Sequence, residues 1–65
     1  MAKTAKRIQS ARHSKRLTQA QVAKGAGIST NYYAQVERGE KNPATTLLIR
    51  IIDALGVSSK DIIGK

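Results

Sequence analysis

The chain has 65 residues, no cysteine and a single histidine, and its 12 lysines and arginines face only 4 acidic residues, which gives a formal net charge of +8. This length allows one domain, residues 1–65, with a small core, and the composition excludes a disulfide framework or a thiolate metal site. No apolar run approaches the roughly 18 residues of a membrane span, and no apolar stretch follows the basic start as in a secretion signal. We therefore expect a cytoplasmic protein.

The positive charge is concentrated near the start of the chain. Half of the basic residues lie within the first sixteen positions: Lys3, Lys6, Arg7, Arg12, Lys15 and Arg16. In a domain of this size, such a balance is typical of a protein that binds a polyanion, nucleic acid above all. The alternative is a basic surface that only keeps the protein in solution.

The first predicted helix runs from about Thr4, which can cap it, to about Lys15, and residues 1–3 are expected to fray. Ile8 and Arg12 fall on its inner side. An unpaired charge on that side would be costly. Arg12 therefore needs an acidic partner elsewhere in the chain.

A second helix is predicted over about residues 19 to 25 or 26. Thr18 and Gln21 have the spacing of a capping box, in which each side chain bonds to the backbone of the other. Gly27 follows where a positive φ is expected, because glycine adopts that conformation without a Cβ clash. The second helix therefore ends in a tight turn.

A third helix is predicted over about residues 30 to 37 or 38. Ser29 can cap its start, and Gly39 is expected to end it. Tyr32 or Tyr33 is the first of its apolar positions at helical spacing. The stretch from Thr18 to Gly39 thus reads as two short helices joined by a turn.

The fourth helix is predicted to begin near residue 45 or 46 and to stop at Gly56. Its inward residues recur at i, i+3, i+4 and i+7: Leu48, Ile51, Ile52 and Leu55. A second capping box, Ser58 with Asp61, opens a short last helix whose Ile62 and Ile63 are expected to reach toward the core. The sequence therefore predicts an all-α domain of five helices.

The spacing of Ala23, Gly27 and Tyr33 is that of a helix-turn-helix, in which a small residue lets the helices approach, glycine makes the turn, and the third residue packs between them. Around it stand the strings L-T-Q-A-Q-V-A, G-I-S and Q-V-E-R-G-E-K-N-P. Together they make residues 6–63 resemble the phage-repressor and Cro-like (XRE-type) helix-turn-helix family. The resemblance implies a compact lambda-repressor-like DNA-binding domain with the helix-turn-helix at helices two and three.

The resemblance also implies a semi-buried ion pair between Arg12 and Glu37, joining the first helix to the end of the recognition helix. A bidentate pair of this kind would be structural rather than catalytic. The alternative is that both residues are ordinary surface charges.

In helix-turn-helix proteins, the N-terminal residues of the second helix of the motif lie against base edges in the major groove. Asn31 and Gln35 can each present a donor and an acceptor together, which matches the N6/N7 edge of adenine. With Tyr33 in the core, Tyr32 is expected to face outward. The alternatives are a solvated face, or tyrosines that stack on single strands. The implied base-contacting residues are Thr30, Asn31, Tyr32 and Gln35.

Phosphate contacts are expected from residues that flank the recognition helix and from the start of the second helix. Gln19 matches the family position that binds a phosphate beside the start of its helix. Such contacts set register and affinity without reading sequence directly. The implied set is Gln19, Ser29, Arg38, Lys41 and Asn42.

Some positions depart from the family pattern. Arg16 stands where glycine is usual, Thr45 where an aliphatic residue is frequent, and Ile52 where a small residue is usual. Helix four is therefore expected to pack at a shifted angle or to expose more apolar surface. The alternative for the apolar residues near it is scattered surface hydrophobes. We expect the C-terminal helices to form a dimer interface through Leu47, Ile49, Ile62 and Ile63.

The sequence thus predicts a sequence-specific double-stranded DNA-binding transcriptional regulator of repressor or controller type. We expect a homodimer on a pseudo-palindromic operator, associated with a bacterial or phage nucleoid, with no cofactor, metal or small-molecule effector. An enzyme is not expected, because the hydroxyls are ordinary, the histidine stands alone, and the acids have caps or ion pairs to fill. The alternatives are an antitoxin-like or protein-interaction module on the same scaffold, or a non-specific nucleic-acid binder.

Overall fold

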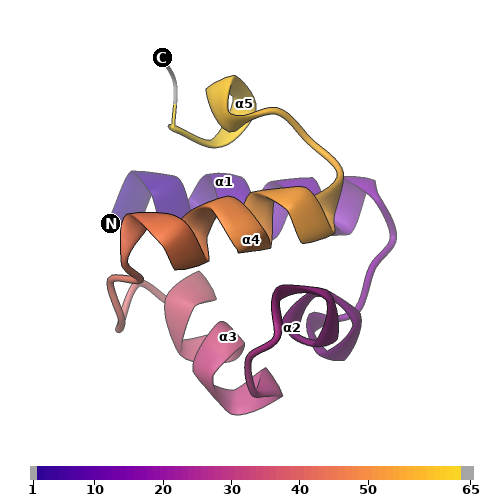
Figure 1. Cartoon of the computed structure of the whole chain (residues 1–65). Coiled ribbons are helices and arrows are strands. Elements are labelled where there is room, and N and C mark those ends of the chain that lie inside the picture. Colours follow the sequence, from indigo (N-terminus) through magenta and orange to yellow (C-terminus); the bar gives the residue numbers. More distant parts are fainter. Residues whose placement is uncertain (1, 64–65) are drawn as a thin grey trace.

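The structure, a computed structural model, describes residues 2–63, apart from the side chain of Ala2. Its helices are α1 (Ala2–Ser14), α2 (Gln19–Ala26), α3 (Thr30–Glu37), α4 (Thr45–Leu55) and α5 (Ser59–Ile63) (Figure 1). Residues 2–63 contain no strand, so the predicted all-α fold of five helices is confirmed. Within this range, no helix is long and apolar enough to cross a bilayer.

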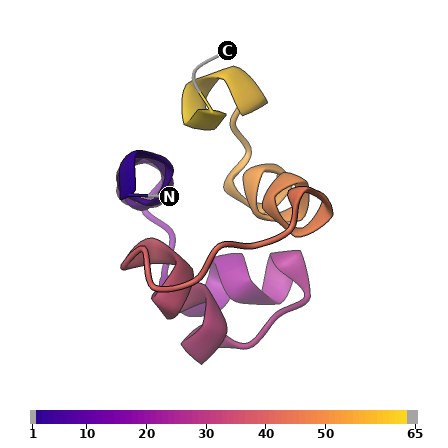
Figure 2. The same cartoon turned by 90° about the vertical axis from the view of Figure 1, so that its left-hand side faces the viewer.

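Two of the helices form a central layer. α1 and α4 run in the same direction across the middle of the molecule, with α5 on one side of them and α2 and α3 on the other (Figures 1 and 2). The most extensive packing joins α2 to α4 and to α3. The helix-turn-helix therefore lies on the opposite side of the central layer from α5.

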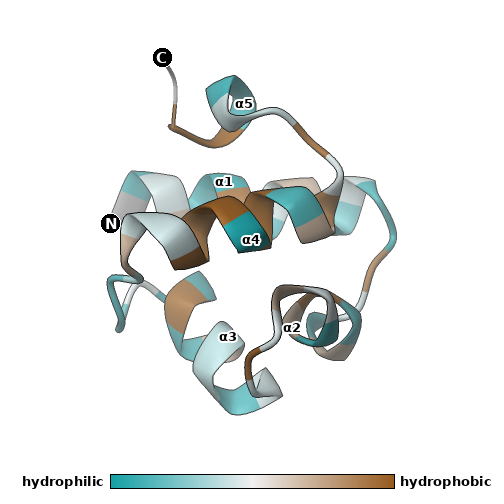
Figure 3. Ribbon diagram, viewed as in Figure 1, coloured by the Kyte–Doolittle hydropathy of each residue, from teal (hydrophilic) through white to brown (hydrophobic). Residues whose placement is uncertain are grey.

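A small apolar core joins all five helices. α4 is rich in hydrophobic residues (Figure 3). Of its predicted stripe, Ile51, Ile52 and Leu55 are buried and Leu48 is partly buried. Burying one such side chain contributes about 1.5–3 kcal/mol. The core therefore fixes the position of α3 relative to the other helices. Its largest fully buried side chains are Ile8, Val22, Tyr33, Val36, Ile51, Leu55 and Ile62.

The predicted caps set the boundaries of α2 and α3. The Gln21 N–H donates to Thr18 Oγ1 over 3.1 Å, and the Thr18 N–H donates to Gln21 Oε1 over 2.8 Å. Gly27 ends α2 with a φ of 73°. The Tyr32 N–H donates to Ser29 Oγ over 3.0 Å at the start of α3. Interactions between near neighbours in sequence thus define the turn of the motif.

The start of α1 differs from the prediction. The helix already includes Ala2 and Lys3, so Thr4 lies inside its first turn instead of capping it, while Met1 lies outside the described residues. Alanine has the highest helix propensity, which favours extension of the helix toward the chain end. At its other end, α1 stops at Ser14, one residue before the predicted boundary.

Gly25 lies inside α2, at the contact between α2 and α4. A Cβ atom added at Gly25 would lie 3.0 Å from the Cβ of Ala54, which is tighter than most such contacts. Glycine inside a helix costs about 1 kcal/mol relative to alanine. At this position the cost is offset by the close approach of the two helices.

The turn between α1 and α2 holds Arg16 in the left-handed conformation, with a φ of 57°. The Arg16 N–H donates to the His13 carbonyl over 3.0 Å, and the Leu17 N–H donates to the Arg12 carbonyl over 3.1 Å. This is the Schellman pattern that follows many helices and favours glycine at the left-handed position. This left-handed backbone explains why the family pattern usually has glycine at the position of Arg16.

We predict that Arg16→Gly raises the free energy of unfolding by about 1 kcal/mol. The left-handed conformation costs a residue with a Cβ about 1–2 kcal/mol, and the greater freedom of glycine in the unfolded chain offsets part of the gain. Urea denaturation measures the change. Arg16→Ala removes the same charge but keeps the Cβ, so it should show no such gain; equal gains would attribute the effect to charge instead.

Candidate nucleic-acid interface

The residues of α3 divide the helix into two faces. Thr30 and Asn31 are exposed and Gln35 is partly exposed. Because residues four apart lie one above the other on a helix, Asn31 and Gln35 share one outer strip. The structure therefore places these three predicted base-contacting residues at the surface of α3. The opposite face is buried and consists of Tyr33, Ala34, Val36 and Glu37.

Tyr32 lies at the boundary between these two faces. It is partly buried and packs against the core, while the neighbouring Tyr33 is fully buried in the motif's packing position. The two side chains point about 100° apart around the helix, so only one can be central to the core. The expected outward position of Tyr32 is therefore found only in part.

Two of the predicted phosphate contacts also have structural roles. Ser29 Oγ accepts the capping hydrogen bond from the Tyr32 N–H, and Gln19 Nε2 donates to Glu37 Oε1 over 3.2 Å. A hydroxyl that accepts can still donate its own proton, and a side-chain amide carries two N–H donors. Each residue therefore retains a donor group that can form a hydrogen bond to a phosphate oxygen.

The loop after α3 carries the other predicted phosphate contacts, and all of them are exposed. Arg38 Nε donates to Glu40 Oε2 over 2.7 Å, and Arg38 Nη2 donates to Glu40 Oε1 over 3.2 Å. An ion pair this exposed is weak, so a phosphate can compete with Glu40 for the guanidinium. Sequence reasoning missed Glu40, although the two residues stand only two positions apart. Lys41 and Asn42 follow in the same loop.

A hollow of about 590 Å³ lies between the start of α1 and the end of α3. Three of its lining residues are basic and one is acidic: the lining consists of Lys3, Ala5, Lys6, Gln9, Glu37 and Arg38. Among the described residues, no group of three His, Cys, Asp or Glu side chains is placed to hold a metal ion. The three basic side chains of the lining extend the basic surface at the end of α3.

The ion pair that the resemblance implied joins α1 to the end of α3. Arg12 Nε donates to Glu37 Oε2 over 2.5 Å, and Arg12 Nη2 donates to Glu37 Oε1 over 3.2 Å. The Arg12 side chain is 12% exposed and the Glu37 side chain 1% exposed. Arg12 Nη1 also donates to the Leu17 carbonyl over 2.9 Å. The guanidinium of Arg12 thus joins α1, the following turn and the end of α3.

The surroundings of Glu37 keep its carboxylate charged. Burial alone would raise the pKa of Glu37, but hydrogen bonds from Arg12 and Gln19, together with the nearby Tyr33 hydroxyl, hold this pKa below its usual value. Burial raises the pKa of Tyr33, so its hydroxyl stays neutral. That hydroxyl is buried with no hydrogen-bond partner of good geometry among the described residues. The Arg12–Glu37 pair and Gln19 therefore carry the polar interactions of this region.

This pKa shift predicts a loss of stability in acid. A carboxylate whose pKa is lower in the folded state stabilises the protein above its unfolded pKa, which is about 4.3 for glutamate. The contribution is then lost as the pH falls through the folded pKa. Urea denaturation from pH 7 to pH 3 should show this decline in the parent protein and a flatter one in Glu37→Gln. Asp53→Asn, on the exposed side of α4, leaves the pair intact and should retain the decline of the parent.

The predicted dimer residues do not all lie at the surface. Ile62 is 1% exposed, which confirms its predicted place in the core and contradicts its assignment to an interface. Ile63 is 41% exposed, so the prediction that it reaches toward the core was wrong. Adjacent residues of a helix point in different directions, which separates the two. Leu47 is partly buried against the core, and Ile49 is 48% exposed. Ile49 and Ile63 therefore remain as the exposed apolar residues of the predicted set.

Sequence reasoning also missed Arg50 of α4. Its guanidinium fills the space that a Cβ on Gly27 would need. The positive φ of Gly27 is the stronger reason for glycine at this position, because the end of the Arg50 side chain can move aside. No pattern within α4 indicates the contact, because it depends on how α4 packs against α2.

Comparison with known sequences agrees with this architecture. A sequence model of the helix-turn-helix family matches residues 8–62. The immunity repressor protein of Bacillus phage phi105 is 37% identical over 59 residues, which cover 91% of this chain and 41% of the repressor. An uncharacterized HTH-type transcriptional regulator, y4dJ, of Sinorhizobium fredii is 38% identical over 52 residues, which cover 80% of this chain and 68% of that protein. The chain therefore spans about two fifths of the length of the phage repressor.

Solved structures share the fold over nearly the whole chain. The restriction-modification controller protein C.AhdI from Aeromonas hydrophila superposes with a TM-score of 0.88 at 26% identity, covering 94% of this chain and 92% of that protein. The clp gene regulator ClgR from C. glutamicum superposes with a TM-score of 0.92 at 29% identity, covering 95% of this chain and 80% of the other. With the family match over residues 8–62, these findings show that the chain belongs to the helix-turn-helix family of phage-repressor and Cro-like (XRE-type) proteins.

Proposed function

We propose that the protein is a sequence-specific transcriptional regulator that inserts the N-terminal half of α3 into the major groove of double-stranded DNA. The observation that carries this proposal is the outer face of α3, where Thr30, Asn31 and Gln35 remain accessible while the opposite face is buried. The names of the similar proteins, which include a repressor, a restriction-modification controller protein and a gene regulator, support the same role.

Direct reading of bases rests on Asn31 and Gln35. Each side-chain amide can donate to and accept from the same adenine edge in the major groove. The two residues lie one turn apart on the outer strip of α3, so they can reach neighbouring base pairs. The methyl group of Thr30 can contact thymine, and Tyr32 remains partly accessible on the same helix.

Affinity for the backbone comes from both ends of the motif. The start of α2 presents the free N–H groups and partial positive charge of a helix terminus, with Gln19 beside them. Ser29 offers a donor at the start of α3, and Arg38, Lys41 and Asn42 follow the end of that helix. Together these groups would fix the register of α3 in the groove.

A homodimer would place two such helices in successive major grooves about 34 Å apart. We assign the interface to the exposed Ile49 and Ile63, with Leu47 at its edge. We predict that Ile49→Glu shifts the protein to a monomer in sedimentation analysis and lowers its affinity for a two-half-site operator, since a charge would be buried in the interface. Ser10→Glu, which adds the same charge at an exposed position on α1, serves as the control. A dimer that survives Ile49→Glu would contradict the assignment.

Selection from a random duplex library tests the function itself. We expect the full chain at physiological salt to enrich one sequence with two related half-sites about one helical turn apart. Binding without enrichment, combined with a steep loss of affinity as salt rises, would leave only the non-specific electrostatic interaction and would overturn the proposal.

A further inference from the structure

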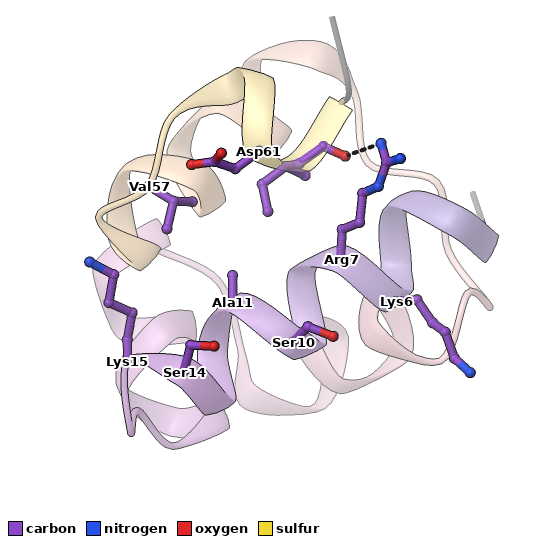
Figure 4. A pocket seen from close by; sticks show the side chains of 9 residues that line it. Lys6, Arg7, Ser10, Ala11, Ser14, Lys15, Val57 and Asp61 are labelled. Carbon is purple, nitrogen blue, oxygen red and sulfur yellow. Dashed lines mark hydrogen bonds between the residues drawn. The ribbon is translucent and has the colours of Figure 1, made fainter.

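A second hollow lies on the side of the molecule away from the recognition helix. It has a volume of about 360 Å³ and lies between α1 and α5 (Figure 4). Its floor is apolar, because Ala11, Val57 and the buried Ile62 line it. α5 and α3 lie on opposite sides of the central layer (Figures 1 and 2), so the hollow stays open when α3 faces DNA.

The two ends of this groove are basic. Figure 4 shows Arg7 at one end and Lys15 at the other, with the methyl group of Ala11 pointing into the hollow between them. Arg7 Nη1 donates to the Ile62 carbonyl over 3.4 Å, which holds its guanidinium beside α5. The one acidic side chain of the lining, Asp61, accepts the Ser58 N–H over 3.3 Å as the cap of α5. The groove therefore combines an apolar floor with cationic ends.

We propose that the α1–α5 groove binds an acidic amphipathic segment of a partner protein. One aliphatic side chain of the segment would lie over Ala11 and Val57, and carboxylates on either side of it would pair with Arg7 and Lys15. Charge decides the class of occupant. A second copy of this chain has only 4 acidic residues, one of which, Glu37, is buried, so it offers few carboxylates to these ends. The DNA backbone has no apolar group to place on the floor, whereas an acidic helix with an aliphatic strip matches both the apolar floor and the basic ends.

The arrangement would let the protein hold DNA and a partner protein at the same time, with the two ligands on opposite sides of the central layer. This inference goes beyond DNA binding and stands on the groove alone. Its test does not require the operator to be known, because binding of a peptide to the groove is measured directly.

The test is a titration followed by NMR of the full chain. The probe is an amphipathic helical peptide of about twelve residues, with leucine at every third or fourth position and glutamate elsewhere. We expect saturable shifts at Ala11, Val57 and Ile62. A peptide with serine in place of leucine should bind at least about tenfold more weakly, because the apolar contact is lost. Equal binding of the two peptides would show a generic polyanion effect and overturn the proposal.

Two variants identify the groove. Lys15→Glu should weaken binding of the leucine peptide about tenfold. Lys24→Glu makes the same change in net charge at an exposed position of α2 and should leave binding nearly unchanged. Ala11→Leu fills the floor and should abolish binding; its melting curve reports whether the fold survives, and Lys15→Glu remains decisive if it does not. Equal losses in Lys15→Glu and Lys24→Glu would overturn the assignment.

Two further outcomes would also contradict the proposal. Shifts at Ala11 and Val57 that grow with protein concentration in the absence of peptide would assign the groove to a second copy of the chain. Displacement of a bound DNA duplex by the peptide would place the peptide on the DNA-facing side. We expect neither, and we expect the shifts at Val57 to be the same with DNA present.

Discussion

Replacing Glu37 by alanine should lower the free energy of unfolding by about 3–5 kcal/mol, the usual cost of removing one member of a buried ion pair. The guanidinium of Arg12, with a side chain only 12% exposed, would lose both of its carboxylate bonds, and Gln19 would lose its acceptor. A domain of 65 residues has a total stability of only about 3–10 kcal/mol. We therefore expect Glu37→Ala to be largely unfolded at 37 °C by circular dichroism.

The double variant Arg12→Met with Glu37→Leu distinguishes the loss of the whole ion pair from the loss of only one of its charges. Burying two charges is itself costly, so an apolar pair of similar volume should be far less destabilising than Glu37→Ala alone. Recovery should be incomplete, because the Leu17 carbonyl loses the hydrogen bond from Arg12. A loss below about 1 kcal/mol in Glu37→Ala would place the pair among ordinary surface charges and contradict our interpretation.

The second large effect concerns binding of the selected duplex. Asn31→Ala and Gln35→Ala should each weaken it by about 1–3 kcal/mol, or roughly fivefold to 150-fold, because a paired amide in the groove is lost. Asn31 is exposed and Gln35 partly so, and alanine is the better helix former, so neither change should harm the fold. Fluorescence anisotropy at fixed salt measures the change. Ser10→Ala, on the α5 side of α1, is the matched control and should bind like the parent.

Lys41→Ala provides the contrast that a phosphate contact requires. It should weaken binding to every duplex by a similar factor and reduce the salt slope by about one. If Asn31→Ala and Gln35→Ala behaved in that way too, α3 would be holding the backbone rather than reading bases.

Features set by neighbours in sequence were predictable. The capping pairs Thr18 with Gln21 and Ser58 with Asp61 need only local geometry, and the structure contains both. The positive φ of Gly27 was predictable for the same reason, and Gly56 ends α4 as predicted, also in the left-handed conformation. The burial of Ala23 and Tyr33 in the core followed from the helix-turn-helix spacing, which specifies how the two short helices approach each other.

Features set by packing between distant elements were not predictable. Which of Ile62 and Ile63 enters the core depends on how α5 rotates against α1, and the sequence of five residues does not specify that rotation. The contact of Arg50 with Gly27 likewise depends on the approach of α4 to the turn. Tyr32 was expected outside, but its ring is large enough to reach the core from a boundary position.

The most direct measurement compares the parent protein and Gln35→Ala on a set of duplexes in which each base pair of the selected site is changed in turn. If α3 reads bases, the parent should lose about 1–3 kcal/mol at each contacted pair, and the variant should become indifferent at one position in each half-site while keeping its preference at the others. The same base preferences in both proteins, differing only by a constant factor, would show that this helix does not recognise the operator through its outer side chains.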